Sequence, residues 1–267
     1  MTRIALGIEY DGSAFKGWQA QVQPGICTVQ EELEISLAKL ANHPVKTTCA
    51  GRTDAGVHAV GQVVHYDSET LRTPQAWVFG TNNYLPPSVR VLWHRAVPEA
   101  FDARYSALSR RYRYLIYNHP LRPSLLRQGV GWYYRPLAVE PMQAAARYWI
   151  GEHDFSSFRA AGCQSRSPVR SVYAIDLYRT GDQIIIDITA NAFLQHMVRN
   201  MVGVLMRIGA GFEPSTWAQT VLNAKDRRAA GLAAPASGLY LIAVHYPQHF
   251  GLPTHVPAVP GFVDNNR

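Results

Sequence analysis

Residues 51–67 read GRTDAGVHAVGQVVHYD, and this stretch decides how the chain around it is organised. Residues 45–51 before it and 60–67 within it have the apolar and alternating patterns of β-strands. The intervening GRTDAGVH has two glycines around an arginine and an aspartate, which is typical of a turn. The pattern therefore predicts a loop between two strands, and the loop is a structural turn, a phosphate cradle or the carrier of a catalytic carboxylate.

Outward from this loop, the N-terminal half alternates strands and helices. Residues 28–41 are expected to form a helix, because Thr28 and Glu31 make a capping box before leucines at helical spacing. Residues 73–86 are expected to be helical or irregular. Apolar alternation predicts strands over residues 3–12 and 88–98.

The C-terminal half repeats this mixture loosely. Strands are predicted over 110–120 and 238–247, with a hairpin over 170–191. Helices are predicted over 141–155, 192–211 and 215–225. Interleaved elements with hairpin-length connections favour an α+β fold with a largely antiparallel sheet.

Two similar halves are expected from this order. The boundary should fall near residues 98–109, which gives an N-terminal half over 1–105 and a C-terminal half over 106–247. The proline-rich segment 248–267 is expected to be an extended or disordered tail.

Composition limits the class of protein. The chain has 267 residues, of which 47% are hydrophobic, enough for a sizeable core. Its net charge of +7 is consistent with a polyanionic partner such as nucleic acid. Three widely spaced cysteines fit a reducing cytoplasm better than a disulfide framework. We expect no membrane span and no signal peptide, because no apolar run has the necessary length or position.

Two readings of the loop can be rejected from its residues. Gly51 and Gly56 resemble half of a P-loop, but Val57 and His58 stand where lysine and serine or threonine are required. The histidines and cysteines show no metal-binding spacing. Asp54 then remains, either as a structural turn residue or as a catalytic carboxylate, which would need an arginine partner.

A candidate partner is Arg199 in the predicted helix over 192–211. On a helical projection the apolar residues fill one arc, and a narrow polar stripe fills the other, made of His196, Arg199, Asn200, Gly203 and Arg207. The stripe is either the outer side of a surface helix or a face toward a cleft. Gly203 is unfavourable inside a helix and therefore indicates the close approach of another segment.

The strand over 110–120 combines basic and aromatic residues. Tyr112 and Tyr114 share one face, while Arg111 and Arg113 share the other. This spacing suits RNA binding through phosphates and stacked bases, and equally suits a core strand with tyrosines inward.

Five segments together resemble the TruA family of tRNA pseudouridine synthases. In chain order they are GRTDAGVHAVGQVVHYD, RRYRYLIYN, DFSSFRA, NAFLQHMVRNMVG and GLYLIAVHY. The resemblance implies the pseudouridine synthase fold with a central cleft. It also implies conversion of uridine to pseudouridine at positions 38, 39 and 40 of the tRNA anticodon stem-loop, by a homodimer that needs no metal or cofactor.

The resemblance also assigns roles to residues. Asp54 corresponds to the catalytic aspartate and Arg199 to the arginine that pairs with it. Tyr112 corresponds to the tyrosine that stacks on the target base and assists deprotonation at C5. Arg52 would help displace the base, and Leu239 would lie below the uracil ring. The remaining candidates for RNA contact are His58, which could instead brace the loop, and Arg110, Arg111 and Arg113.

Two questions stay open at this stage. Asp54 could attack C1′, add to C6 of uracil, or remove the C2′ proton to give a glycal. Alternatively, the chain is a non-catalytic RNA-binding or chaperone protein of the same fold. Such a protein would gain nothing from the Asp54 carboxylate, which would face phosphates. A nucleoside glycosidase is less suitable, because that chemistry usually needs two carboxylates.

Overall fold

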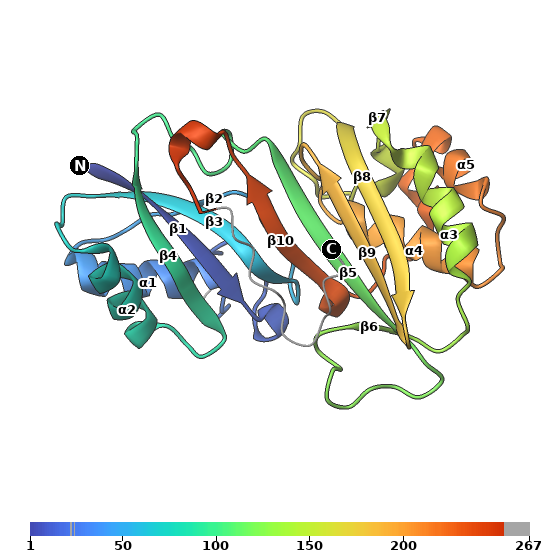
Figure 1. Ribbon diagram of the computed structural model, residues 1–267, viewed down its shortest axis with the longest axis horizontal. Helices are drawn as coiled ribbons and strands as arrows, with labels where there is room; N and C mark the ends of the chain where they lie inside the picture. Colours follow the sequence, from blue (N-terminus) through green and yellow to red (C-terminus); the bar gives the residue numbers. More distant parts are fainter. Residues whose placement is uncertain (22, 24, 254–267) are drawn as a thin grey trace. The chain divides into compact units, whose positions relative to one another are not determined.

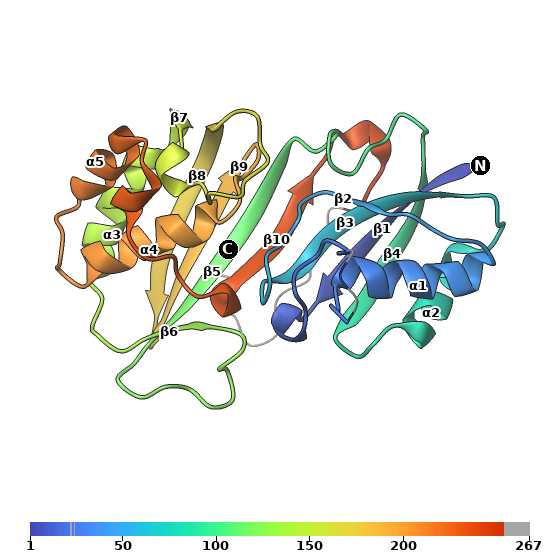
Figure 2. The ribbon, with the colours of Figure 1, turned by 180° about the vertical axis from the view of Figure 1, so that it is seen from behind.

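The computed structural model describes residues 1–21, 23 and 25–253, which form two compact units. Among the described residues, unit 1 comprises Met1–Leu108 together with residues 241–253, and unit 2 comprises Ser109–Tyr240. Ten strands and five α-helices lie in the described residues (Figures 1 and 2). The predicted α+β class with a largely antiparallel sheet is therefore confirmed. No helix in the described ranges is long and apolar enough to cross a membrane.

The strands of unit 1 follow the order β4-β1-β3-β10, with β2 paired to β3. Their bounds are β1 Thr2–Tyr10, β2 Thr48–Cys49, β3 His58–Ser68, β4 Val89–Val97 and β10 Leu239–His245, whose last five residues belong to this unit. The long β3 is antiparallel to β1, with Leu6 opposite Val64. Its residues are buried at nearly every position, so both faces of β3 are covered. The strands predicted on both sides of the GRTDAGVH loop are thus β2 and β3.

The helix expected over 28–41 is present, and the segment expected to be helical or irregular over 73–86 is a helix. Helix α1 spans Val29–Ala41, and the Thr28 hydroxyl accepts from the Glu31 N–H at its start. Helix α2 spans Pro74–Tyr84 and begins in the same way, at Thr73. Figure 2 shows α1 in front of the strands of this unit. The buried ring of Trp77 fastens α2 to the sheet through Tyr66 and His94.

The strands of unit 2 follow the order β5-β9-β8-β7, with β6 paired in parallel to β5. Their bounds are β5 Ser109–Asn118, β6 Gly131–Tyr133, β7 Gly151–Asp154, β8 Val169–Thr180 and β9 Gln183–Ala190. The predicted hairpin is β8 and β9, in which Thr180 pairs with Gln183. Gly181 has a φ of 56°, the left-handed conformation that favours glycine in such a tight turn.

Three α-helices belong to unit 2, and two predicted bounds were wrong. They are α3 Val139–Ala146, α4 Met197–Gly209 and α5 Trp217–Ala224. The helix expected over 141–155 ends in a 3-10 turn at Trp149, because Gly151 takes a φ of 106° and the chain continues as β7. The helix expected over 192–211 begins only after His196, whose left-handed φ of 63° cannot continue a helix. Strand β6 was not predicted.

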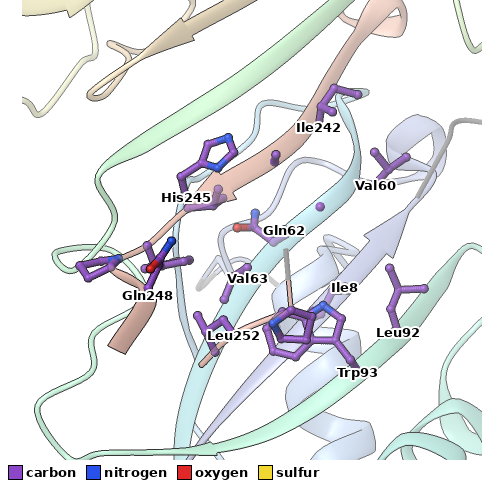
Figure 3. A pocket seen from close by; sticks show the side chains of 17 residues that line it. Ile8, Val60, Gln62, Val63, Leu92, Trp93, Ile242, His245, Gln248 and Leu252 are labelled. Carbon is purple, nitrogen blue, oxygen red and sulfur yellow. The ribbon is translucent and has the colours of Figure 1, made fainter. Parts of the chain in front are cut away.

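The described start of the expected tail is folded against unit 1. Gln248–Phe250 form a 3-10 helix, and Phe250 and Leu252 pack on a core cluster that includes Phe101. A cavity of about 300 Å³ lies beside this segment and is lined by residues of β1, β3, β4 and β10 and by the residues after β10 (Figure 3). Its walls are mainly apolar. Residues 254–267 of the expected tail lie outside the described residues.

Candidate active site

The GRTDAGVH loop is tied to its own unit by hydrogen bonds to its backbone. The Gln62 side-chain amide donates to Gly51 O at 2.7 Å and accepts from Gly51 N–H at 3.3 Å. The Trp18 N–H donates to Thr53 O at 3.0 Å. Because Gln62 and Trp18 are almost fully buried, these bonds hold the loop in one conformation.

A glycine against the loop allows this close packing. Gly17 has a φ of 94°, and a Cβ at this position would lie 2.8 Å from Thr53 O. The Thr53 hydroxyl is 2.7 Å from the Tyr10 hydroxyl at the end of β1. Residues of the segment 10–18 therefore support the loop. Their spacing gave no signal of this role.

Arg52 and Asp54 are the polar residues that this support presents. Arg52 is exposed and Asp54 is half-buried, while Thr53 between them points inward. The Val57 N–H donates to Asp54 O at 3.1 Å, which closes a tight turn after the carboxylate. Burial raises the pKa of the Cys49 thiol to about 12, and the nearby Arg52 guanidinium opposes that shift. The loop thus presents one carboxylate, that of Asp54, and one guanidinium, that of Arg52, on a backbone fixed by hydrogen bonds.

His58 contacts the turn that follows β1. Its side chain is buried, with Nδ1 at 3.2 Å from the Gly12 N–H and 3.1 Å from Asp11 Oδ1. A Cβ on Gly12 would overlap Val57 O at 1.9 Å, so the two segments touch through their backbones. These contacts support the bracing role of His58, and its RNA contact stays a prediction.

In unit 2, Arg199 lies in the first turn of α4 and is half-buried. Its Nε donates to Ala234 O, and its own carbonyl accepts from the Ala234 N–H, both at 2.9 Å. The Nε bond fixes one edge of the guanidinium, and the backbone bond ties the start of α4 to Ala234. The cation is also close enough to Tyr114 to oppose the rise in the phenol pKa that burial causes.

The polar stripe of α4 faces protein rather than water along much of its length. Asn200 is fully buried and donates to Phe158 O at 2.7 Å. Gly203 lies against the segment 232–238, where an added Cβ would be 2.1 Å from Leu232 O. The close approach predicted from Gly203 is confirmed. Arg207 is exposed and pairs with Glu213 at 2.9 Å.

Gly203→Ala should therefore disturb Arg199 without touching it. The new methyl group has to push the backbone at Leu232 away from α4, and Ala234 carries the carbonyl that orients Arg199. We expect a loss of about 1–3 kcal/mol in the free energy of unfolding, together with slower turnover. Urea unfolding measures the first, and single-turnover kinetics measures the second. Gly162→Ala is the control for adding a methyl group without a clash, because Gly162 has no positive φ and the added Cβ would lie 3.8 Å from Gln195 Oε1.

Tyr112 and the arginines of β5 occupy different environments. Tyr112 is buried, and its ring meets Phe193 edge-on at 5.0 Å between centroids. Arg113 is 3% exposed and donates two hydrogen bonds to Asp187 on β9, at 2.8 and 2.9 Å. Arg111 shares that carboxylate at 2.7 Å. Arg110 donates to Asn191 O at 2.8 Å. Arg111 and Arg113 thus neutralise a buried acid between two strands, so their contact with RNA stays a prediction.

Leu239, the first residue of β10, is buried at the end of the segment 232–238. This segment is held at Pro235 O by the Tyr114 hydroxyl at 2.8 Å. The Ser237 hydroxyl donates to Val130 O at 2.9 Å. One short segment therefore links the position of Leu239 to that of Arg199 within unit 2. The sequence analysis assigned no role to this segment, because its small residues carry no side-chain pattern.

The candidates fall into two groups. Arg52, Asp54 and His58 share the loop of unit 1, and the other candidates lie in unit 2. The pairing of Asp54 with Arg199 joins different units and stays a prediction.

Among the described residues, no three His, Cys, Asp or Glu side chains lie close enough to hold a metal ion. The cavity of Figure 3 has no carboxylate among the described residues that line it, so it does not compete with the Asp54 loop for carboxylate chemistry.

Known proteins match this chain over most of its length. The family model described as tRNA pseudouridine synthase matches residues 7–106 and 145–247. The tRNA pseudouridine synthase A of Coxiella burnetii (strain Dugway 5J108-111) is 57% identical over 263 residues, which cover 98% of this chain and 100% of the relative. That of Vibrio cholerae serotype O1 (strain ATCC 39541 / Classical Ogawa 395 / O395) is 53% identical, with 99% of each chain covered. That of Alcanivorax borkumensis is 53% identical, with 95% of this chain and 94% of the relative covered.

These matches extend over nearly the whole chain and include the loop. The chain therefore belongs to the TruA family of tRNA pseudouridine synthases, which are isomerases.

Proposed function

We propose that this chain converts uridine to pseudouridine at positions 38, 39 and 40 of the tRNA anticodon stem-loop, with Asp54 as the reacting carboxylate. The observation that carries the proposal is the braced loop of unit 1, which presents a half-buried carboxylate beside an exposed arginine. A non-catalytic RNA-binding protein would gain nothing from a carboxylate facing a polyanion.

The chemistry needs few groups, because the substrate and product are isomers. The N1–C1′ bond breaks and a C5–C1′ bond forms, while the C5 proton leaves and N1 gains a proton. An ionised carboxylate serves by attacking C1′, by adding to C6, or by taking the C2′ proton. The three routes stay open.

The proposed partners of Asp54 come from unit 2. Arg199 would keep the carboxylate ionised in a site that excludes water, and its anchored Nε supports a fixed direction of approach. Tyr112 and Leu239, both buried side chains, would hold the uracil ring on its two faces and stop it from leaving while it turns. Tyr112 would also assist removal of the C5 proton. Arg52 would help draw the nucleotide out of its stack.

Two further properties belong to the proposal. We expect a homodimer, and the exposed leucines of the β5–β6 connection (Leu121, Leu125 and Leu126) supply apolar surface that such contacts use. We also expect a cytoplasmic location, which the three free cysteines support. Analytical ultracentrifugation tests the first of these.

The choice of positions is tested with four tRNA transcripts. Three carry one uridine each at position 38, 39 or 40, and the fourth carries none of them but keeps uridines elsewhere. Chemical mapping should find pseudouridine at the single target in each of the first three transcripts and none in the fourth. Modification at other uridines in the fourth transcript would contradict the assignment to the anticodon stem-loop.

A further inference from the structure

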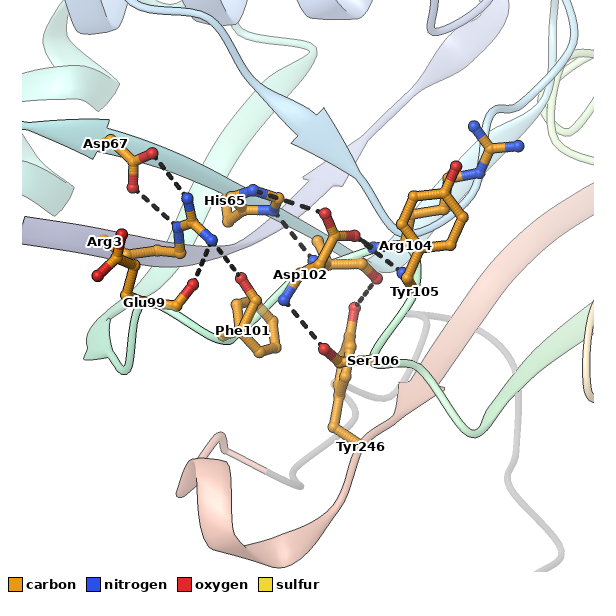
Figure 4. Close-up of polar contacts among 11 residues, drawn as sticks. Arg3, His65, Asp67, Glu99, Phe101, Asp102, Arg104, Tyr105, Ser106 and Tyr246 are labelled. Carbon is orange, nitrogen blue, oxygen red and sulfur yellow. Dashed lines mark hydrogen bonds and ion pairs between the residues drawn. The ribbon is translucent and has the colours of Figure 1, made fainter.

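The connection between β4 and β5 contains a turn that is fastened to the sheet of unit 1 (Figure 4). Arg3 on β1 donates to the carbonyls of Glu99 and Phe101, and its guanidinium pairs with Asp67 on β3 at 2.8 Å. Phe101 is fully buried. The start of the turn is therefore held by the hydrogen-bonded carbonyls of Glu99 and Phe101 and by the buried ring of Phe101.

Ala103, at the centre of the turn, has both backbone groups bound by side chains. Its N–H donates to His65 Nδ1 at 3.0 Å, and its carbonyl accepts from the Tyr246 hydroxyl at 2.6 Å. Burial lowers the pKa of His65 while Asp102 opposes the shift, which keeps Nδ1 available as an acceptor at neutral pH. Asp102 Oδ1 accepts from the N–H groups of Arg104 and Tyr105, both at 2.8 Å. The backbone of this turn is consequently fixed at every residue from 101 to 105.

The residues that the turn presents are Arg104 and Tyr105. Arg104 is exposed, and the Tyr105 ring is 79% exposed. The guanidinium lies 5.3 Å from the ring centroid, a cation–π distance. Figure 4 shows both side chains at the end of the turn away from Arg3. A fixed backbone that holds a large aromatic ring in water suggests a ligand that stacks on it.

The turn lies next to the start of the GRTDAGVH loop in the same unit. Ala103 and Ala50 belong to one core cluster, and Ala50 is followed directly by Gly51 and Arg52. His65, which binds the turn, is paired with Thr48 on β2. The Cys49 thiol is also within electrostatic reach of both Arg52 and Arg104. The basic end of the loop and the Arg104–Tyr105 pair thus share one neighbourhood.

We propose that Arg104 and Tyr105 form an RNA contact beside the reacting loop, in which Arg104 binds a phosphate and Tyr105 stacks on an unpaired base of the anticodon loop. The guanidinium suits phosphate oxygens, and the ring stacks on any base, so the contact gives affinity rather than a choice of sequence. The inference rests on the proposed function, because it takes the tRNA anticodon stem-loop as the ligand. Neither residue takes part in the chemistry.

Binding is measured with unmodified tRNA by fluorescence anisotropy, with each variant placed in an Asp54→Asn background so that no product forms. Tyr105→Ala should raise Kd about tenfold through the lost stacking, and Tyr105→Trp should restore it. Arg104→Gln should raise Kd. It should also reduce the slope of log Kd against log salt concentration by the amount expected for the loss of about one phosphate contact. In the active protein the same variants should raise KM and leave kcat nearly unchanged.

Tyr84→Ala is the matched control. Tyr84 on α2 is 50% exposed and has the Lys39 ammonium 4.9 Å from its ring centroid, so it repeats the cation–π pair on the helical side of the unit. Its loss should leave Kd unchanged. Kd values for the Arg104 and Tyr105 variants within twofold of the parent would overturn the inference. A changed oligomeric state with unchanged tRNA affinity would also overturn it, and would make the turn a contact between copies.

These outcomes are separable from failure of the proposed function. A wild-type protein that binds tRNA but forms no pseudouridine contradicts the proposed function. The Kd values of the Arg104 and Tyr105 variants still decide whether the turn contacts RNA.

Discussion

Asp54→Asn should abolish pseudouridine formation while the protein stays folded and binds tRNA. An amide can neither attack carbon nor accept the C2′ proton, so every open route loses its reacting group. We expect the single-turnover rate to fall by at least about 10³-fold. Asparagine fills the same space on a half-exposed loop position, so the free energy of unfolding should change by less than about 0.5 kcal/mol.

Product is followed as tritium released from [5-³H]uridine in tRNA, since the C5 proton leaves in the reaction. Asp182→Asn provides the control, because it removes one negative charge from an exposed turn between β8 and β9. Removing charge near a polyanion should leave tRNA affinity unchanged or slightly raised in both variants. An Asp54→Asn protein that turns over within tenfold of wild type would show that another group reacts.

Arg199→Lys should have the second largest effect. Lysine keeps the positive charge but cannot donate to Ala234 O through Nε while presenting a planar pair of donors to a carboxylate. If Arg199 orients the ionised Asp54, the lysine variant should lose about 10²-fold in kcat, with a much smaller change in tRNA affinity. The unfolding temperature of this variant should fall only slightly, while its kcat falls strongly.

A merely structural role of Arg199 predicts the opposite split. In that case the lost bond to Ala234 would lower the unfolding temperature, and kcat of the folded fraction would stay near that of wild type. Arg207→Lys is the control on the same helix, because Arg207 is exposed and pairs with Glu213 at 2.9 Å. It should leave kcat unchanged. A double variant of Asp54 and Arg199 should be no slower than Asp54→Asn alone if the two act as a unit.

Local sequence signals predicted most helices and strands. They did so where the spacing of apolar residues and the capping residues indicate the same element. The Thr28 capping box marks the start of α1, and the apolar arc of α4 is fully buried. Errors occurred where a backbone angle ended an element. Gly151 and His196 adopt positive φ values that apolar spacing does not reveal. Strand β6 was not predicted, because its three residues are too few to show an alternating pattern.

The candidate site residues could be named from the sequence, but the contacts that hold their loop could not. Asp54 and Arg52 stood out because a Gly-flanked acid and base followed a strand. The bonds from Gln62 and Trp18 to the loop backbone were hidden, since backbone acceptors leave no mark on side-chain patterns. The same holds for Asp187, whose pairing with Arg111 and Arg113 depends on the β5–β9 register. That register could not be read from one sequence.

The most direct measurement is tritium release from [5-³H]uridine-labelled, unmodified tRNA by the purified wild-type protein, with chemical mapping of the product. With no added metal or nucleotide, the protein should release tritium in proportion to pseudouridine, and the pseudouridine should map to positions 38, 39 and 40. Tight tRNA binding without any release of tritium would contradict isomerisation by this chain, and would favour a protein that only binds RNA.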